Sequence, residues 1–259
     1  MKESPEYSTL AHIYDTVMDD VDYESWANFI DEVIQVNHHD PITIMELACG
    51  TGSIALSLDE LMCYDIMATD KSPHMIEIAR HKKRNQMANV DFRVMDFLSI
   101  KPDKKFDAVI STFDSVNYLH DPKQVVQMLE EVQKLLTPES IFVFDFTTPR
   151  NSIQSIQYLN NEEGYAPDNY RFYRKSKYDP RDQIHYNTFT IEKLAEDEET
   201  VLEKFQEVHK QRIYTLAEML DIIDETEYTV LAKYDGFDLV DADNSSLRIT
   251  MVLQCPTIQ

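Results

Sequence analysis

Glycine usage constrains this chain more than any other feature of its sequence. The 259 residues include only four glycines, and two of them, Gly50 and Gly52, fall in one tripeptide. The tripeptide follows a short apolar stretch at 42–47 that is typical of a buried strand, and a helical pattern begins at Ser53. Glycine at such a turn permits left-handed dihedrals and lets a ligand approach the backbone closely. In an open α/β sheet, ligands bind beyond the carboxyl ends of the strands, so this turn predicts a ligand site.

Short apolar strands alternate with helical patterns up to residue 146. The sequence predicts strands at 42–47, 64–69, 90–94, 106–112 and 141–146, and helices at 22–36, from Ser53, from Ser72-Pro73 and at 121–136. Nearly all-apolar strands that alternate with helices indicate a parallel sheet covered on both faces. Between the third and fourth strands we predict only an irregular link, where a crossover helix is usual.

The pattern changes after Pro149. Three stretches of alternating character between residues 170 and 214 predict an antiparallel meander. Thr215 and Glu218 form a capping-box sequence that opens a helix, and two final strands are expected at 228–234 and 247–254. We therefore predict a core made of residues 1–150 plus 213–259, with an inserted antiparallel β lid over residues 151–212.

Acidic side chains stand at the ends of two predicted strands. Asp70 ends the second strand, 18 positions after Gly52, where a carboxylate can accept the ribose hydroxyls of a nucleotide. Asp96 and Phe97 end the third strand, where an acid and an aromatic ring suit an adenine. The positions of these residues in register with the glycine turn predict a nucleoside site.

Three segments together resemble the first three motifs of class I S-adenosylmethionine-dependent methyltransferases: residues 46–52, residues 69–75 and residues 95–97. The resemblance implies a Rossmann-like α/β sheet, mostly parallel with an antiparallel last strand and helices on both faces. It also implies S-adenosyl-L-methionine as cofactor, with S-adenosyl-L-homocysteine as product. Ala48 stands where many members of this class have a first glycine, a mild departure.

Further segments extend the resemblance over nearly the whole chain. Residues 106–114 resemble the fourth motif, whose end faces the transferred methyl group. Tyr14-Asp15 with the following helix is similar to the N-terminal cover of a bacterial small-molecule subgroup, and Glu207-Val208-His209 resembles a segment of amino-sugar N,N-dimethyltransferases. The implied cofactor-binding residues are Tyr14, Trp26, Glu46, Ala48, Cys49, Gly50, Gly52, Asp70, Lys71, Met75, Asp96, Phe97 and Phe113.

The expected reaction is methyl transfer to a small-molecule nitrogen or oxygen acceptor. A sulfonium is already an activated donor, so the protein mainly has to align the acceptor and exclude water. His209 is our candidate for a catalytic base or an acceptor-orienting residue. The other residues expected to meet the acceptor are Asp114, Asn117, Tyr118, Glu207 and Arg212.

Two alternative functions stay open at this point. Residues 50–55 also satisfy the dinucleotide pattern G-x-G-x-x-G/A, which would suit an NAD-dependent oxidoreductase. Against it, no second βαβαβ half follows the fifth strand, and Asp96 has no set role in a dinucleotide fold. A non-catalytic S-adenosylmethionine-binding protein is the second alternative, since a fold does not establish catalysis.

Composition narrows the remaining classes of partner. The 47 acidic and 24 basic residues give a net charge of −23, which disfavours a nucleic acid partner. The three cysteines form no CxxC pair, and no metal site is expected. Without a signal peptide or an apolar run long enough to cross a membrane, the expected location is the cytoplasm. An exposed edge of the inserted sheet would suit a homodimer.

Overall fold

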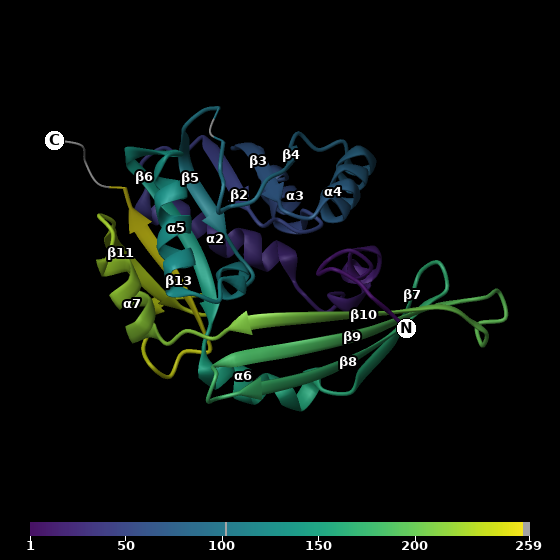
Figure 1. Cartoon of the computed structure of the whole chain (residues 1–259). Coiled ribbons are helices and arrows are strands. Elements are labelled where there is room, and N and C mark those ends of the chain that lie inside the picture. Colours follow the sequence, from purple (N-terminus) through teal and green to yellow (C-terminus); the bar gives the residue numbers. More distant parts are fainter. Residues whose placement is uncertain (102, 256–259) are drawn as a thin grey trace.

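Two β-sheets organise the protein, which is described here by a computed structural model of residues 1–101 and 103–255. Figure 1 shows an upper sheet flanked by helices and a lower sheet of long strands that runs across the molecule. The chain crosses from the first sheet to the second after residue 147 and returns after residue 212.

The larger sheet has eight strands, of which the first five in space are parallel. Its order is β4 (Asp91–Val94), β3 (Asp65–Asp70), β2 (Thr43–Leu47), β5 (Phe106–Ser111), β6 (Leu136–Thr147), β13 (Arg248–Gln254), β11 (Thr229–Asp235) and β12 (Asp238–Asp241). The strand β13 pairs antiparallel with both β6 and β11. This mostly parallel sheet with an antiparallel closing strand confirms the predicted fold class.

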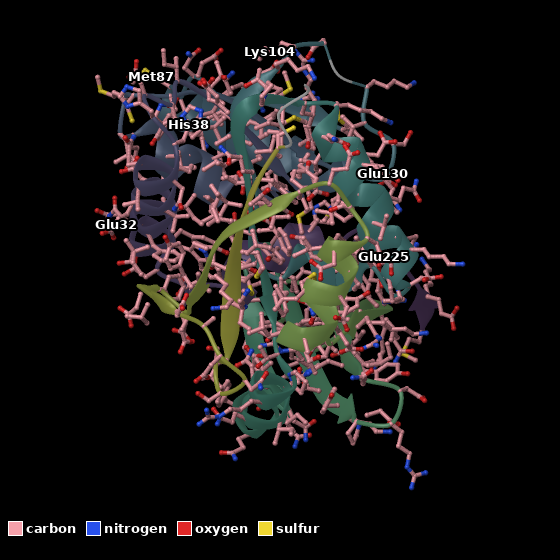
Figure 2. The ribbon with its side chains drawn as sticks, turned by 90° about the vertical axis from the view of Figure 1, so that its left-hand side faces the viewer. Glu32, His38, Met87, Lys104, Glu130 and Glu225 are labelled. Atoms are coloured by element: carbon pink, nitrogen blue, oxygen red, sulfur yellow. The ribbon has the colours of Figure 1, made fainter. Side chains whose placement is uncertain are left out.

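Helices cover both faces of the larger sheet, as the apolar strands require. On one face α2 (Tyr23–Asn37), α3 (Ser53–Asp59) and α4 (Pro73–Gln86) bury their apolar sides, and on the other α5 (Pro122–Gln133) and α7 (Leu216–Asp224) do so. Figure 2 shows the sheet between these layers, with Glu32 pointing outward on one side and Glu130 and Glu225 on the other.

The smaller sheet has five strands, all antiparallel except the first pair. Its order is β1 (Lys2–Glu3), β10 (Val201–Arg212), β9 (Ile184–Leu194), β8 (Tyr170–Asp179) and β7 (Glu162–Ala166). The three long strands are the predicted meander. The start of the chain, which the predicted division assigned to the core, pairs with β10 and continues into η1 (Leu10–Ile13) and α1 (Tyr14–Val17) over the inner face of this sheet.

Several short elements had no clear signal in the sequence. They are the strands β7 and β12 and the 3₁₀ turn η2 (Ser115–Tyr118). The helix α6 (Pro149–Leu159) was also missed, although its Thr148-Pro149 start is the same kind of signal as Ser72-Pro73. Between β4 and β5 the described residues form no helix, so the irregular link is confirmed. Of the helices in residues 1–101 and 103–255, none is long and apolar enough to cross a membrane.

Candidate functional site

The turn between β2 and α3 adopts left-handed backbone at three positions. Ala48, Gly50 and Gly52 have φ values of 54°, 55° and 79°. A Cβ added to Gly50 would meet no atom within 4 Å, so the backbone there faces open space. A Cβ on Gly52 would lie 2.6 Å from the ring of Phe92, so this glycine serves the packing of α3. The two glycines therefore have different roles, and only Gly50 is free to face a ligand.

Asp70 lies beside this turn and holds it in place. Its carboxylate accepts the backbone N–H of Gly50 at 2.9 Å and that of Ser72 at 2.7 Å. Burial raises the pKa of Asp70, and these two hydrogen bonds oppose that shift. Each carboxylate oxygen has further lone pairs, which can accept hydroxyl groups of a ligand that lies over Gly50.

Glu46 is a buried acid with an unsatisfied oxygen. It lies on β2 at 2% exposure, and its Oε2 has no hydrogen-bond partner in the described part of the chain. Burial raises the pKa of Glu46 to about 8. A cationic group bound nearby would favour the ionised carboxylate and satisfy this oxygen.

These residues line one cleft, which we call the glycine-turn cleft. It has a volume of about 250 Å³ and extends from Glu46 and Gly50, past Asp70, to Asp96 and Phe97. Asp96 accepts the backbone N–H of Leu98 and pairs with Lys71 at 3.2 Å. The acids at the ends of β3 and β4 therefore stand along one groove, as the sequence predicted.

The N-terminal segment closes one side of the glycine-turn cleft. Glu207 on β10 accepts the backbone N–H groups of Tyr7, Thr9 and Leu10 at 3.0, 2.6 and 2.9 Å. Burial alone would raise the pKa of Glu207, but the hydrogen bonds from His209 and from this segment outweigh it and lower the pKa. An ionised carboxylate thus fixes the segment that carries Tyr7.

A second hollow, the inter-sheet cavity, lies between the two sheets. Its volume of about 600 Å³ is in the usual range for small-molecule sites. Side chains of β8, β9 and β10 line it on one side, and residues of β6, β13 and α6 line it on the other. Four aromatic residues line both this cavity and the glycine-turn cleft: Tyr7, Tyr14, Phe113 and Tyr118. The two hollows therefore adjoin at these four rings.

A strained turn after β5 forms part of that boundary. Phe113 and Asp114 are both left-handed, with φ values of 64° and 51°, and both N–H groups donate to the carboxylate of the buried Asp145. Arg248 donates to Asp145 at 2.7 Å and also to Asp114. Burial raises the pKa of Asp145, whereas the charge of Arg248 lowers it.

Most of the predicted site residues meet in these two hollows. Eleven of the thirteen predicted cofactor-binding residues line the glycine-turn cleft: Tyr14, Glu46, Ala48, Cys49, Gly50, Asp70, Lys71, Met75, Asp96, Phe97 and Phe113. Asp114, Tyr118 and His209, which were predicted to meet the acceptor, line the inter-sheet cavity.

Five predicted site residues line neither hollow. Gly52 packs on Phe92, and Trp26 stacks behind Phe113 with ring centroids 4.3 Å apart. The side chain of Asn117 is buried in hydrogen bonds to the backbone of Thr147 and Arg212. Arg212 pairs with Glu218, and Glu207 with the N-terminal segment. Each of these five supports a neighbour of the site.

Other lining residues had no signal in the sequence. Tyr7 precedes every predicted element, and Arg174, Asn187 and Gln211 occupy inward positions of strands whose facing partner was unknown. The alternating pattern predicted the strands but not which of their faces points inward, and only the packing of the two sheets shows that these residues face a cavity. In the part of the chain that the structure describes, no three His, Cys, Asp or Glu side chains are grouped as a metal site would need.

Comparisons with known proteins give the enzymatic class. Residues 44–139 match the family model described as a methyltransferase domain. A Geobacillus sp. (strain WCH70) protein that is named as a methyltransferase is 25% identical over 253 residues, which cover 95% of this chain and 98% of the relative.

Solved structures share the fold over nearly the whole chain. A S-adenosylmethionine-dependent methyltransferase from Clostridium acetobutylicum has a TM-score of 0.77 at 24% identity, with 96% of this chain and 99% of that chain covered. An amino pentose methyltransferase from Micromonospora echinaspora, solved with its S-adenosylmethionine, has a TM-score of 0.67 at 15% identity, with 93% and 96% covered. Both the larger and the smaller sheet therefore belong to an architecture that other proteins share.

Proposed function

The chain is a methyltransferase, and we propose that it transfers the methyl group of S-adenosylmethionine to an amine or hydroxyl of a small molecule. The observation that carries this proposal is the arrangement of the two hollows. A cleft suited to a nucleoside meets a cavity suited to an acceptor, and four aromatic residues form their common boundary.

The residues of the glycine-turn cleft fit S-adenosylmethionine. Gly50 leaves room for a ligand against the backbone, and Asp70 can accept the ribose hydroxyls. Asp96 and Phe97 suit the amino edge and ring of adenine, and Met75 lies in the same wall. The unsatisfied Oε2 of Glu46 suits the ammonium group of the methionine moiety.

The bound cofactor supplies an activated methyl group on a sulfonium. The protein contributes position and the exclusion of water, which can account for much of such a rate enhancement. Tyr7, Tyr14, Phe113 and Tyr118 present aromatic surface where the two hollows meet, and aromatic faces attract cations. Asp145 and Arg248 hold Phe113 and Asp114 in the conformation that places them there.

An amino sugar is the acceptor class that we favour. The inter-sheet cavity is lined by hydrogen-bonding side chains from both sides, including Asn151, Arg174, Asn187 and Gln211, which suits a molecule with several hydroxyl groups. The amino pentose methyltransferase that shares this architecture supports the same acceptor class. The homodimer expected from the sheet edge stays a prediction.

Two features of the fold argue against the two alternative functions. An NAD-dependent oxidoreductase would need a second nucleotide-binding half, but beyond β6 the described sheet continues with the antiparallel β13 and β11. A non-catalytic protein that binds S-adenosylmethionine would not need an acceptor cavity of about 600 Å³ beside the cofactor cleft.

Calorimetric titration with S-adenosylhomocysteine, with NAD titrated in parallel, tests the cofactor. We expect micromolar binding of S-adenosylhomocysteine alone, and a loss of at least about tenfold in Asp70→Asn because a charged acceptor becomes a neutral amide. Incubation with methyl-labelled S-adenosylmethionine and a panel of amino sugars and simple amines then tests transfer. Binding of NAD alone would refute the proposal, and binding without any transfer would favour the non-catalytic alternative.

A further inference from the structure

A chain of four side chains leads from the boundary of the two hollows into the smaller sheet. The hydroxyl of Tyr7 contacts that of Tyr118, which lies 3.3 Å from Nδ1 of His209. Nε2 of His209 lies 3.3 Å from Oε2 of Glu207. Tyr7, Tyr118 and His209 line the inter-sheet cavity, whereas Glu207 is fully buried behind them.

Glu207 determines the direction of the hydrogen bonds in this chain. Its oxygens accept three backbone N–H groups of the N-terminal segment, which stabilise the ionised carboxylate. An ionised carboxylate can only accept, so Nε2 of a neutral His209 has to carry the proton. Nδ1 is then an acceptor, and it can receive the hydroxyl proton of Tyr118.

The hydroxyl of Tyr118 is the next member of this chain after His209. Burial raises the pKa of Tyr118 well above its ordinary value, so the hydroxyl stays protonated and passes protons rather than carrying a charge. Tyr7 and Tyr118 both line the two hollows, and of the two it is the Tyr118 hydroxyl that lies 3.3 Å from Nδ1 of His209. Its oxygen therefore connects an acceptor at the boundary of the hollows to His209. We propose that Tyr118, His209 and Glu207 form a proton relay that deprotonates an ammonium acceptor before methyl transfer.

This inference rests on the proposed function and adds the route of the proton. The acceptor ammonium gives one proton to the oxygen of Tyr118, while Tyr118 passes its own proton to Nδ1 of His209. Glu207 stabilises the imidazolium that results. The amine lone pair then forms the bond to the methyl carbon as the carbon–sulfur bond breaks and leaves its electron pair on sulfur. The methylated product is again an ammonium ion, and His209 later returns its proton through Tyr118 to water.

Within this relay the three residues have different roles. Tyr118 is the catalytic residue, because it meets the acceptor. His209 and Glu207 act through it and are positioning residues. The relay is also specific in its substrate class, since an acceptor that is protonated at neutral pH needs such a route and an already neutral nucleophile does not.

The first test reads the tautomer of His209 and requires no acceptor. The protein is labelled with ¹⁵N-histidine, His209→Asn assigns the signals, and spectra are recorded with and without S-adenosylhomocysteine. We expect neutral His209 to be protonated at Nε2, and expect Glu207→Gln to lose this preference, because a glutamine amide can donate as well as accept. A neutral His209 protonated at Nδ1 would overturn the relay, whether or not S-adenosylhomocysteine binds.

The second test uses the amine that the acceptor screen identifies. Tyr118→Phe should lower kcat on the order of 10²-fold, with little change in the KM of the amine or in S-adenosylhomocysteine binding. His120→Asn is the matched control and should leave kcat unchanged, because His120 is exposed and lies outside both hollows. An unchanged kcat in Tyr118→Phe would exclude the relay while leaving the proposed methyl transfer intact.

Discussion

The carboxylate of Asp145, on β6, accepts a hydrogen bond of 2.9 Å from the backbone N–H of Phe113, just beyond the end of β5. The same carboxylate accepts the N–H of Asp114 and a guanidinium N–H of Arg248. One buried acid thus stabilises two consecutive left-handed residues at the boundary of the two hollows. Strained backbone of this kind persists where the surrounding structure determines it.

Asp145→Asn should therefore destabilise the protein and disturb the site. An asparagine has one accepting oxygen and leaves the partly buried Arg248 with Asp114 as its one remaining carboxylate, so we expect a loss of about 3 kcal/mol. The measurement is thermal or denaturant unfolding. Asp241→Asn is a matched control, because Asp241 belongs to an exposed ion pair with Lys233 that is worth at most about 1 kcal/mol. Equal effects of the two variants would contradict this account of Asp145.

The two glycines of the turn should respond differently to alanine. Gly52→Ala places a Cβ 2.6 Å from the Phe92 ring, so we expect overpacking that costs about 1–3 kcal/mol in addition to backbone strain. Gly50→Ala adds a Cβ in open space and should cost only the backbone strain of about 1–2 kcal/mol, but weaken S-adenosylhomocysteine binding at least about tenfold. Unfolding without ligand and calorimetric titration separate the two effects. If the two variants have the same stability and lose the same binding affinity, the two glycines do not have different roles.

Substitutions of Ala48 provide a second test of the left-handed backbone in this turn. Its φ of 54° is left-handed, a conformation that disfavours any side chain, although glycine has the greater unfolded-state entropy. Ala48→Gly should therefore leave stability unchanged or raise it by up to about 1 kcal/mol. Ala48→Val should lower the melting temperature, since a β-branched residue tolerates this conformation least. A clear loss of stability in Ala48→Gly would mean that the alanine methyl group has a packing role.

Glu46 makes stability depend on pH with a defined sign. Its pKa rises from an ordinary value of 4.5 to about 8 in the folded protein. Between these values the folded state keeps a proton that the unfolded state has released, so stability falls as pH rises through this window. Glu46→Gln removes this contribution, and the melting temperature of the variant relative to the parent should increase from pH 5 to pH 8.

The difference between the two proteins isolates Glu46, because all other ionisations are common to both. One unit of pKa shift corresponds to about 1.4 kcal/mol, so the divergence should be measurable by calorimetry. S-adenosylhomocysteine should bind Glu46→Gln more weakly, since a neutral amide offers no charge to an ammonium group. A melting-temperature difference that is constant across this pH range would refute the raised pKa.

The sequence by itself determined the larger sheet, except for the short strand β12, and most of the glycine-turn cleft. Strand and helix periodicity identified the five parallel strands, and parallel strands place their carboxyl ends at one edge. In a sheet of this kind, Gly50, Asp70 and Asp96 therefore lie along that edge. The motif segments lie within a few residues of these strand ends, so local pattern was sufficient to find most of the cleft.

The tertiary structure alone decided the inter-sheet cavity and its connections. The contact of Glu207 with the N-terminal segment joins residues nearly 200 positions apart, and that of Asp145 with Arg248 joins residues 103 positions apart. Neither contact leaves a periodic signal, because each depends on how two sheets pack rather than on how one element forms. For the same reason Trp26, Asn117 and Arg212 looked like ligand-binding residues in the sequence but support the site from behind. Their side chains could bind a ligand, and only the packing around them shows that they already bind other groups of the protein.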